Sequence, residues 1–171
     1  MTATNERKTN RTYALAVLLL AASTLGGAWI FELGLGLEPC PLCLQQRWPY
    51  YIGIPLAAFA WVLANGGHTN YFRLFMGLVG LIFLVSVGLA AYHAGVEYKF
   101  WQGPTGCSAS GGPGSFADFS KAFEQTTAVV RCDEVPWSFL GISLAGYNFL
   151  ISLCLVALCA TAAVKGGRRT R

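Results

Sequence analysis

The sequence contains few charged residues: Lys, Arg, Asp and Glu together make up 12% of its 171 positions. A soluble domain of ordinary composition carries about 25%. Apolar residues make up 54%, and the charged ones cluster, which leaves long uncharged runs. This composition excludes an ordinary soluble protein and indicates a membrane protein. The net charge of +4 is modest and gives no indication of nucleic-acid binding.

The sequence also lacks the motifs of several cofactor classes. It contains no Gly-rich phosphate-binding loop, and nothing in it suggests a haem site. Its longest polar stretch is the loop at about residues 95–141, so no soluble domain remains beside the membrane segments. We therefore expect a single transmembrane domain over residues 1–171.

Four hydrophobic segments approach or exceed the roughly 20 residues that a helix needs to cross a bilayer. The second is long enough only if its helix begins at Pro41, and Pro49 and Pro55 should then kink it. We predict an all-α membrane protein, a bundle of four transmembrane helices. The spans are predicted at about residues 12–31, 41–64, 74–93 and 142–164.

The first segment resembles a signal peptide, with a basic start and small residues at Ala21-Ala22-Ser23. Its apolar run continues past these residues to Phe31, and three more spans follow. We therefore expect an uncleaved helix.

The distribution of Lys and Arg predicts the orientation, because cytoplasmic segments are enriched in them. Eight of the twelve lie in the two terminal segments and in the connection between the second and third spans. The other four, with seven of the eight acidic residues, lie in the two remaining loops. We expect both termini in the cytoplasm, and the loops at about 32–47 and 95–141 outside.

The most informative stretch is Cys40-Pro41-Leu42-Cys43, just ahead of the second span. If Cys40 caps the helix and Pro41 is its first residue, the missing proline N–H costs nothing. Cys43 then lies in the first turn, where the helix dipole favours a thiolate. Arg47 lies one turn further along the same face, and its cation favours that thiolate again. The pattern predicts a redox-active dithiol at the membrane surface.

Four more cysteines follow. Cys107 and Cys132 lie in the second external loop, so four external thiols permit a disulfide relay. Cys154 and Cys159 lie within the fourth span and are expected to pack as small hydrophobes. A zinc site would normally need a second closely spaced pair, so no metal is predicted. Two static structural disulfides are an alternative, although a static clamp needs neither a nearby arginine nor a position at the lipid boundary.

Cys107 lies among glycine- and proline-rich turns, where another protein can reach it. Beyond these turns Phe116, Phe119 and Phe123 recur at helical spacing, with Ser115 as a candidate cap. We predict a short amphipathic helix that lies on the membrane surface.

Four other residues are predicted near the external interface. His93 is predicted at about the depth of Arg47, either as a capping residue or as part of a cofactor site or proton relay. Trp48, Tyr50 and Tyr51 are expected to anchor the helix in the interface as an aromatic belt.

Electrons delivered to the dithiol must leave it, and its position favours a lipid-soluble acceptor such as quinone. Arg47 can hydrogen-bond a quinone oxygen and stabilise its developing negative charge. Composition alone does not identify quinone.

With these features the chain resembles the bacterial disulfide bond formation protein B (DsbB) family. The resemblance runs from the first span to the fourth. It is carried by the four-span layout, by Pro39-Cys40-Pro41-Leu42-Cys43 with Arg47, and by Cys132 followed by Trp137-Ser138-Phe139-Leu140-Gly141.

The resemblance implies a disulfide-generating protein-dithiol:quinone oxidoreductase of the bacterial inner membrane, with periplasmic cysteine loops and ubiquinone or menaquinone as cofactor. It implies that Cys107 exchanges with a periplasmic DsbA-like thiol oxidase and that Cys132 exchanges with Cys40. Cys43 would then interact with the quinone, which Arg47 helps to bind. His93 lies near a position where the family has a polar residue at the quinone end.

Two other functions remain open. One is a related paralogue with a dedicated client or reversed electron flow, such as a vitamin K epoxide reductase-like enzyme. That family places its dithiol near the fourth helix, whereas here the dithiol precedes the second. The other is a membrane scaffold with structural disulfides, whose cysteines would stay oxidised whatever the quinone supply.

Overall fold

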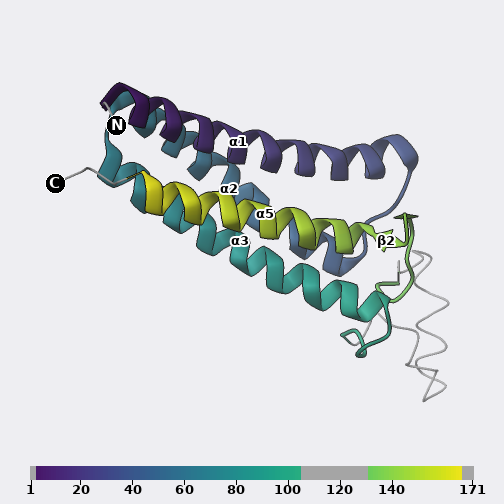
Figure 1. Cartoon of the computed structure of the whole chain (residues 1–171). Helices are drawn as coiled ribbons and strands as arrows, with labels where there is room; N and C mark the ends of the chain where they lie inside the picture. The colour runs from purple at the N-terminus through teal and green to yellow at the C-terminus, as the bar shows by residue number, and fades with distance from the viewer. Residues whose placement is uncertain (1–2, 105–130, 167–171) are drawn as a thin grey trace, which may run out of the picture.

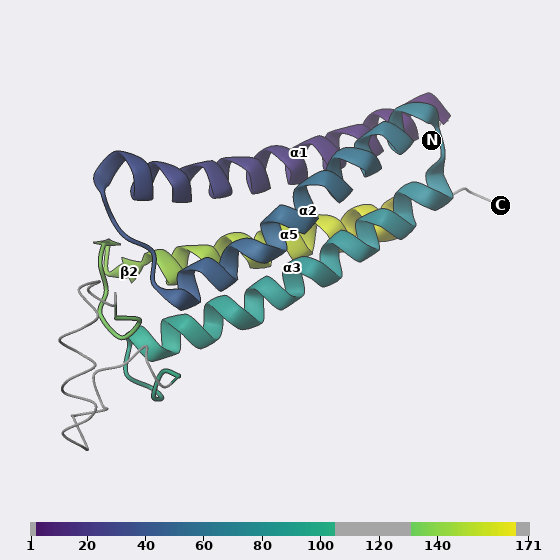
Figure 2. The ribbon, with the colours of Figure 1, turned by 180° about the vertical axis from the view of Figure 1, so that it is seen from behind.

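Four long helices make up most of the structure, a computed structural model that describes residues 3–104 and 131–166. They lie side by side, and α1 begins at the same end of the bundle at which α5 ends (Figures 1 and 2). The helices are α1 (Ala3–Trp29), continued by the π-helical turn η1 (Ile30–Gly34), then α2 (Pro41–Gly66), α3 (Thr69–Glu97) and α5 (Leu144–Lys165).

The core of the bundle follows from the spacing of its buried side chains. On α3, Phe72, Met76, Val79 and Phe83 recur every three or four residues and are fully buried. This spacing places them on one face of the helix. Small residues of the other helices complete the same cluster and allow close approach. They include Ala14, Ala21, Ala57, Ala60, Cys159 and Ala162.

The outward faces of the bundle are apolar as well. Leu19, Leu81 and Val85 are each more than half exposed, which suits side chains that face lipid. Cys159 packs in the core as predicted, whereas Cys154 is exposed on the outer side of α5 rather than buried.

Among the described residues, three segments are long and apolar enough to cross a membrane: Thr4–Gly34, Thr69–Glu97 and Leu144–Lys165. The chain is therefore a multi-pass helical membrane protein, which confirms the predicted class. Helix α2 has 26 residues but is not among the three, and its first turns carry Gln45, Gln46 and Arg47.

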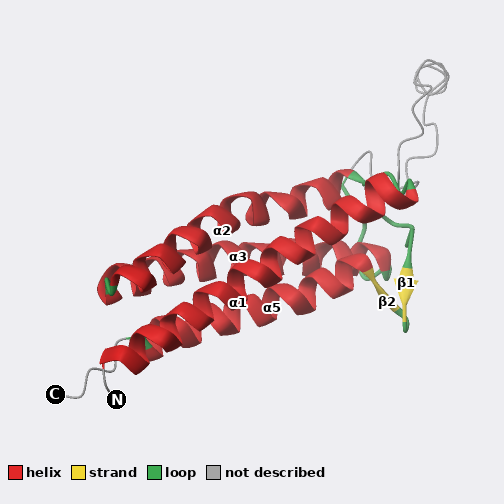
Figure 3. Cartoon of the chain, turned by 90° about the horizontal axis from the view of Figure 1, so that it is seen from above, coloured by secondary structure: helices red, strands yellow, loops and turns green. Residues whose placement is uncertain are grey.

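A short hairpin leads into α5 at one end of the bundle (Figure 3). Strand β1 (Ser138–Phe139) pairs antiparallel with β2 (Ile142–Ser143). The two turn residues, Leu140 and Gly141, both have positive φ, the turn geometry that matches the twist of paired strands. Ser143 then caps α5 by accepting a hydrogen bond from the Gly146 N–H at 3.1 Å. Cys107 and the amphipathic helix predicted at residues 116–123 lie outside the described residues.

Candidate active site

The dithiol sits at the start of α2, in the local geometry that its sequence predicts. Cys40 is the N-cap residue, with extended backbone angles, and Pro41 is the first helical residue. The Cys40 sulfur accepts a hydrogen bond from the backbone N–H of Cys43 at 3.2 Å. This N–H is one of those that a helix start leaves without a backbone partner, so the cap satisfies it.

The two sulfur atoms lie 2.7 Å apart, and both cysteines are free. Only a small movement separates this contact from a disulfide bond of about 2.05 Å. Cys40 is buried, with 3% of its surface exposed. Cys43 is partly buried and faces a cavity. The pair can therefore cycle between dithiol and disulfide without rearranging the helix.

The hydrogen bonds that favour a thiolate converge on Cys40 rather than on Cys43. The contact with the Cys43 thiol and the hydrogen bond with His93 outweigh burial and lower the pKa of Cys40 from its ordinary 9.0 to about 5. From the sequence alone the thiolate is predicted at Cys43, because the helix dipole and Arg47 are the only influences taken into account. In the structure the first-turn N–H of Cys43 points back to the Cys40 sulfur.

Arg47 is on the cavity wall, but its guanidinium forms an ion pair with a carboxylate of η1, the turn that ends the first helix. Its Nη1 donates to Oε2 of Glu32 in η1 at 2.5 Å. The Arg47 side chain is 11% exposed and the Glu32 side chain is 31% exposed, so the cation is the more shielded partner. The ion pair ties the end of the first helix to the start of α2 and holds the guanidinium beside the cavity.

His93 lies beside the dithiol and is almost completely buried, with 2% exposure. Its Nε2 is 3.6 Å from the Cys40 sulfur and 3.8 Å from Oε1 of Glu97, one turn further along α3. Its Nδ1 accepts from Nε2 of Gln46 at 2.6 Å. Of the two roles that the sequence leaves open for His93, this burial favours the site over a capping role in solvent.

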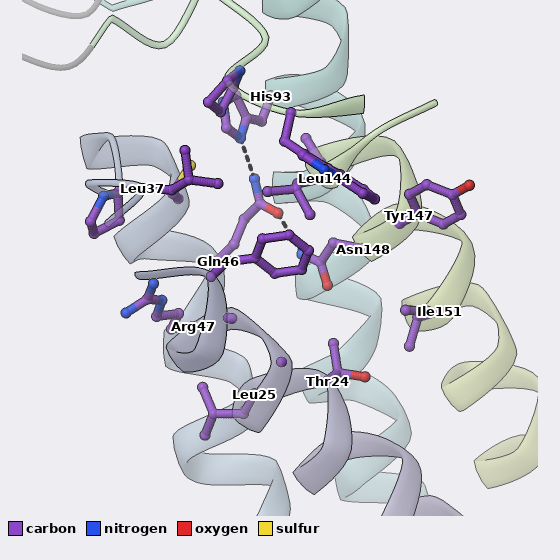
Figure 4. A pocket seen from close by; sticks show the side chains of 18 of the residues that line it. Thr24, Leu25, Leu37, Gln46, Arg47, His93, Leu144, Tyr147, Asn148 and Ile151 are labelled. Carbon is purple, nitrogen blue, oxygen red and sulfur yellow. Dashed lines mark hydrogen bonds between the residues drawn. The ribbon is translucent and has the colours of Figure 1, made fainter. Parts of the chain in front are cut away.

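A cavity of about 510 Å³ opens next to these residues. Its walls come from α1, the start of α2, the end of α3 and the start of α5, and most of the lining is apolar. Figure 4 shows Gln46 extending between His93 and Asn148, with Arg47 on the same side of the site. Such a mainly apolar cavity with a few converging polar groups is typical of a small-molecule site.

Cys132, from the segment between α3 and β1, packs against the dithiol. It is fully buried in a small cluster with Cys40, Leu42 and Val96, and it is disulfide-bonded. The fold therefore brings three of the four predicted redox cysteines together at the site. The fourth, Cys107, is outside the described residues.

The geometry of the cluster favours a redox pair over a metal centre. The two sulfurs and Nε2 of His93 lie within 4.8 Å of one another, close enough for three metal ligands. Two thiolates about 2.3 Å from one tetrahedral zinc ion would be about 3.8 Å apart. The sulfurs of Cys40 and Cys43 are closer, at 2.7 Å, which suits closure into a disulfide.

Several cavity residues are not singled out by the sequence analysis. Glu97, Gln46 and Asn148 all line the cavity. Glu97 accepts a short hydrogen bond from Ser143, the cap of α5. Polar side chains inside a membrane bundle are functional candidates, so Gln46, Glu97 and Asn148 carry a signal that sequence reasoning could have used.

The expectation that Tyr50 anchors the helix in the interface is wrong. Tyr50 is 3% exposed, and its hydroxyl donates to Oδ1 of Asn148 at 2.6 Å. Trp48 and Tyr51 are 64% and 41% exposed, as interface residues would be. Tyr50 points inward because it lies one helical turn beyond Gln46, on the same face.

Together, the bundle and this site define a class of protein: a multi-pass membrane protein with a dithiol at the edge of an apolar cavity. The sequence pattern of the disulfide bond formation protein DsbB family matches residues 10–162 of this chain. The chain belongs to the DsbB family and is a disulfide-forming membrane protein of the oxidoreductase class.

Individual relatives agree with this assignment. The disulfide bond formation protein B of Hahella chejuensis is 31% identical over 168 residues, 94% of this chain and 97% of the relative. That of Xanthomonas euvesicatoria is 32% identical over 158 residues, 86% and 88% of the two chains. An uncharacterised protein of Rickettsia prowazekii is 29% identical over 144 residues, 83% and 81%. No solved structure matches the chain.

Proposed function

We propose that this protein is an inner-membrane thiol:quinone oxidoreductase that reoxidises a periplasmic DsbA-type dithiol oxidase. In the net reaction two thiols of the partner become a disulfide, and two electrons and two protons convert quinone to quinol. The observation that carries the proposal is that Cys43 lines an apolar cavity and its sulfur lies 2.7 Å from that of Cys40, whose pKa is lowered to about 5.

The cavity residues fit a quinone, either ubiquinone or menaquinone. The apolar walls suit a flat ring with a lipid tail, and Arg47 and His93 supply polar groups at the end nearest the sulfurs. Quinone, when bound, would be the two-electron acceptor. Arg47 would orient a ring oxygen by hydrogen bonding, and Cys43 would face the ring from the wall of the cavity.

We infer the relay order from the sequence around Cys107 and from the packing of Cys132. Thiolate attack on a disulfide sulfur is the chemistry of each step. A thiolate of the partner first attacks Cys107, which lies among glycine- and proline-rich turns of the sequence, and opens the disulfide of Cys132. The freed thiolate of Cys132 attacks Cys40, beside which it is packed, and Cys43 leaves as a thiolate. The second thiolate of the partner releases Cys107, which then attacks Cys132 and frees Cys40. The Cys40–Cys43 disulfide reforms as two electrons and two protons pass to quinone.

We further infer that α2 is the fourth membrane span, with both termini cytoplasmic. Helix α2 runs alongside the other three in the bundle (Figure 1). The polar residues of its first turns face the site rather than lipid: Gln46 is buried, and Arg47 is paired with Glu32. The end that carries the dithiol is then the periplasmic end.

The proposal is tested by anaerobic mixing of the purified protein, a reduced DsbA-type partner and a soluble quinone. Quinol formation is followed by absorbance, and partner oxidation by thiol trapping. We expect one quinol per partner disulfide. If quinol does not form while the Cys40–Cys43 disulfide stays closed throughout, the protein is a scaffold with structural disulfides instead.

A further inference from the structure

A continuous hydrogen-bonded row of polar side chains runs from the interior of the bundle to the dithiol. All its members except Asn148 are fully or almost fully buried, where a polar group without a partner is costly. We call this row the polar ladder. Its members are, in order, Ser86, Ser152, Tyr50, Asn148, Gln46, His93 and Cys40.

The hydrogen bond of Tyr50 determines which groups of the polar ladder donate and which accept. The Tyr50 hydroxyl donates to Oδ1 of Asn148 at 2.6 Å. Asn148 therefore presents its oxygen to Tyr50. Its amide nitrogen is left to donate to Oε1 of Gln46. Gln46 then has only its own amide nitrogen to offer His93, at 2.6 Å from Nδ1.

The two amides can only turn together. If Gln46 turned alone, its NH₂ group would face the NH₂ group of Asn148, and two donors would meet without an acceptor. If both turned, the nitrogen of Asn148 would face Tyr50, and the hydroxyl would lose the acceptor to which it now donates. The Tyr50 hydroxyl thus anchors both amides, although it lies far from the sulfurs along the ladder.

We propose that Gln46, Asn148 and Tyr50 are positioning residues that hold His93 in the tautomer with its hydrogen on Nε2, aimed at Cys40. A ring nitrogen that accepts from an amide carries no hydrogen of its own. With Nδ1 occupied in this way, the hydrogen of the neutral ring is on Nε2. That nitrogen lies 3.6 Å from the Cys40 sulfur.

The charged and titratable groups around His93 favour the same tautomer. The carboxyl group of Glu97, which accepts from Ser143, lies 3.8 Å from Nε2, and the Cys40 sulfur lies on that side of the ring too. On the other side, Nδ1 faces the amide donor of Gln46, and the next residue of the polar ladder, Asn148, is neutral. Hydrogen-bond acceptors thus lie at Nε2 and a donor lies at Nδ1, so His93 donates toward Cys40.

This inference rests on the proposed function only in taking Cys40 as a redox thiol, and its test needs neither quinone nor partner. The reduced protein is labelled with nitrogen-15 histidine in lipid nanodiscs. The chain has two histidines, so His68→Gln leaves only the His93 signals. We expect a protonated Nε2 and an unprotonated Nδ1. Gln46→Glu, which replaces the amide donor with an acceptor, should place a proton on Nδ1.

The remote anchor is tested with Tyr50→Phe, which should give both tautomers in comparable amounts. Tyr51→Phe is the matched control, because Tyr51 is the neighbouring residue and is exposed; its spectrum should match the wild type. Asn148→Asp cannot donate to Gln46, so it should give the same mixture of His93 tautomers. This variant replaces Tyr50→Phe in the test if Tyr50→Phe does not fold. A wild-type proton on Nδ1, or a Tyr50→Phe spectrum like the wild type, overturns the inference.

The two proposals fail separately. A wild-type protein with the Nε2 tautomer that forms no quinol counts against the oxidoreductase and leaves the polar ladder standing. Normal quinol formation with the proton on Nδ1 counts against the polar ladder alone.

Discussion

The sulfur of Cys40 and Nε2 of His93 lie 3.6 Å apart although 53 positions separate the two residues in the sequence. The contact joins the cap of α2 to the last turns of α3, where both side chains are shielded from solvent. A hydrogen bond to a buried thiolate is stronger than the same bond in water. The reactivity of the dithiol therefore depends on how these two helices pack.

The first prediction concerns the pH dependence of Cys40. With its pKa lowered from 9.0 to about 5, the folded reduced protein holds a thiolate at pH values where an unfolded chain would hold a thiol. The stabilisation of the reduced fold is thus complete above about pH 9 and is lost as the pH falls toward 5. Iodoacetamide labelling of Cys40, read by mass spectrometry, should stay fast down to about pH 5.

A Cys154→Ser, Cys159→Ser background removes the cysteines of α5 from this measurement. A labelling midpoint for Cys40 near 9.0, its ordinary value, would contradict the prediction.

The second prediction concerns Arg47. Arg47→Ala removes the guanidinium from the cavity wall and leaves Glu32 without its partner. A hydrogen bond to a charged group is worth about 1.5–3 kcal/mol, so we expect kcat/KM for quinone to fall by about ten- to a hundredfold. Thiol exchange between the partner and the loop cysteines should persist. Glu32→Gln, which keeps an acceptor for Arg47, should have a smaller effect; quinone kinetics unchanged in Arg47→Ala would remove Arg47 from the site.

The third prediction separates the two halves of the relay. Cys107→Ser should abolish oxidation of the partner, because the first exchange step loses its sulfur. The Cys40–Cys43 pair should still be oxidised by quinone after chemical reduction. Both activities are measured on one preparation, with Cys154→Ser as the control in which neither changes. Partner oxidation at the normal rate in Cys107→Ser would show that the partner docks elsewhere.

The fourth prediction tests the cavity. Gly27 lines it, and a Cβ added there meets nothing within 4 Å, so Gly27→Leu should fold while filling part of the volume. We expect KM for quinone to rise severalfold. Gly26 is equally open but does not line the cavity, so Gly26→Leu is the matched control. Equal quinone kinetics in the two variants would mean that the acceptor binds outside the cavity.

The sequence alone determined the helical membrane class and the geometry of the dithiol. Apolar segments of spanning length can be recognised by counting, because a helix satisfies its own backbone hydrogen bonds in lipid. The cap at Cys40 and Pro41 is a local structure, set by neighbouring residues. Both features depend on interactions within a few positions of one another, so they can be read without knowing how the helices pack.

Only the tertiary structure decided which side chains surround the sulfurs. In these helices the lipid-facing and core-facing sides are both apolar, so periodicity says little about how each helix is rotated about its axis. That rotation turned Tyr50 inward, away from the interface, and brought Asn148 to Gln46 and His93 to Cys40. The same packing paired Arg47 with Glu32, because a buried cation needs a nearby negative charge.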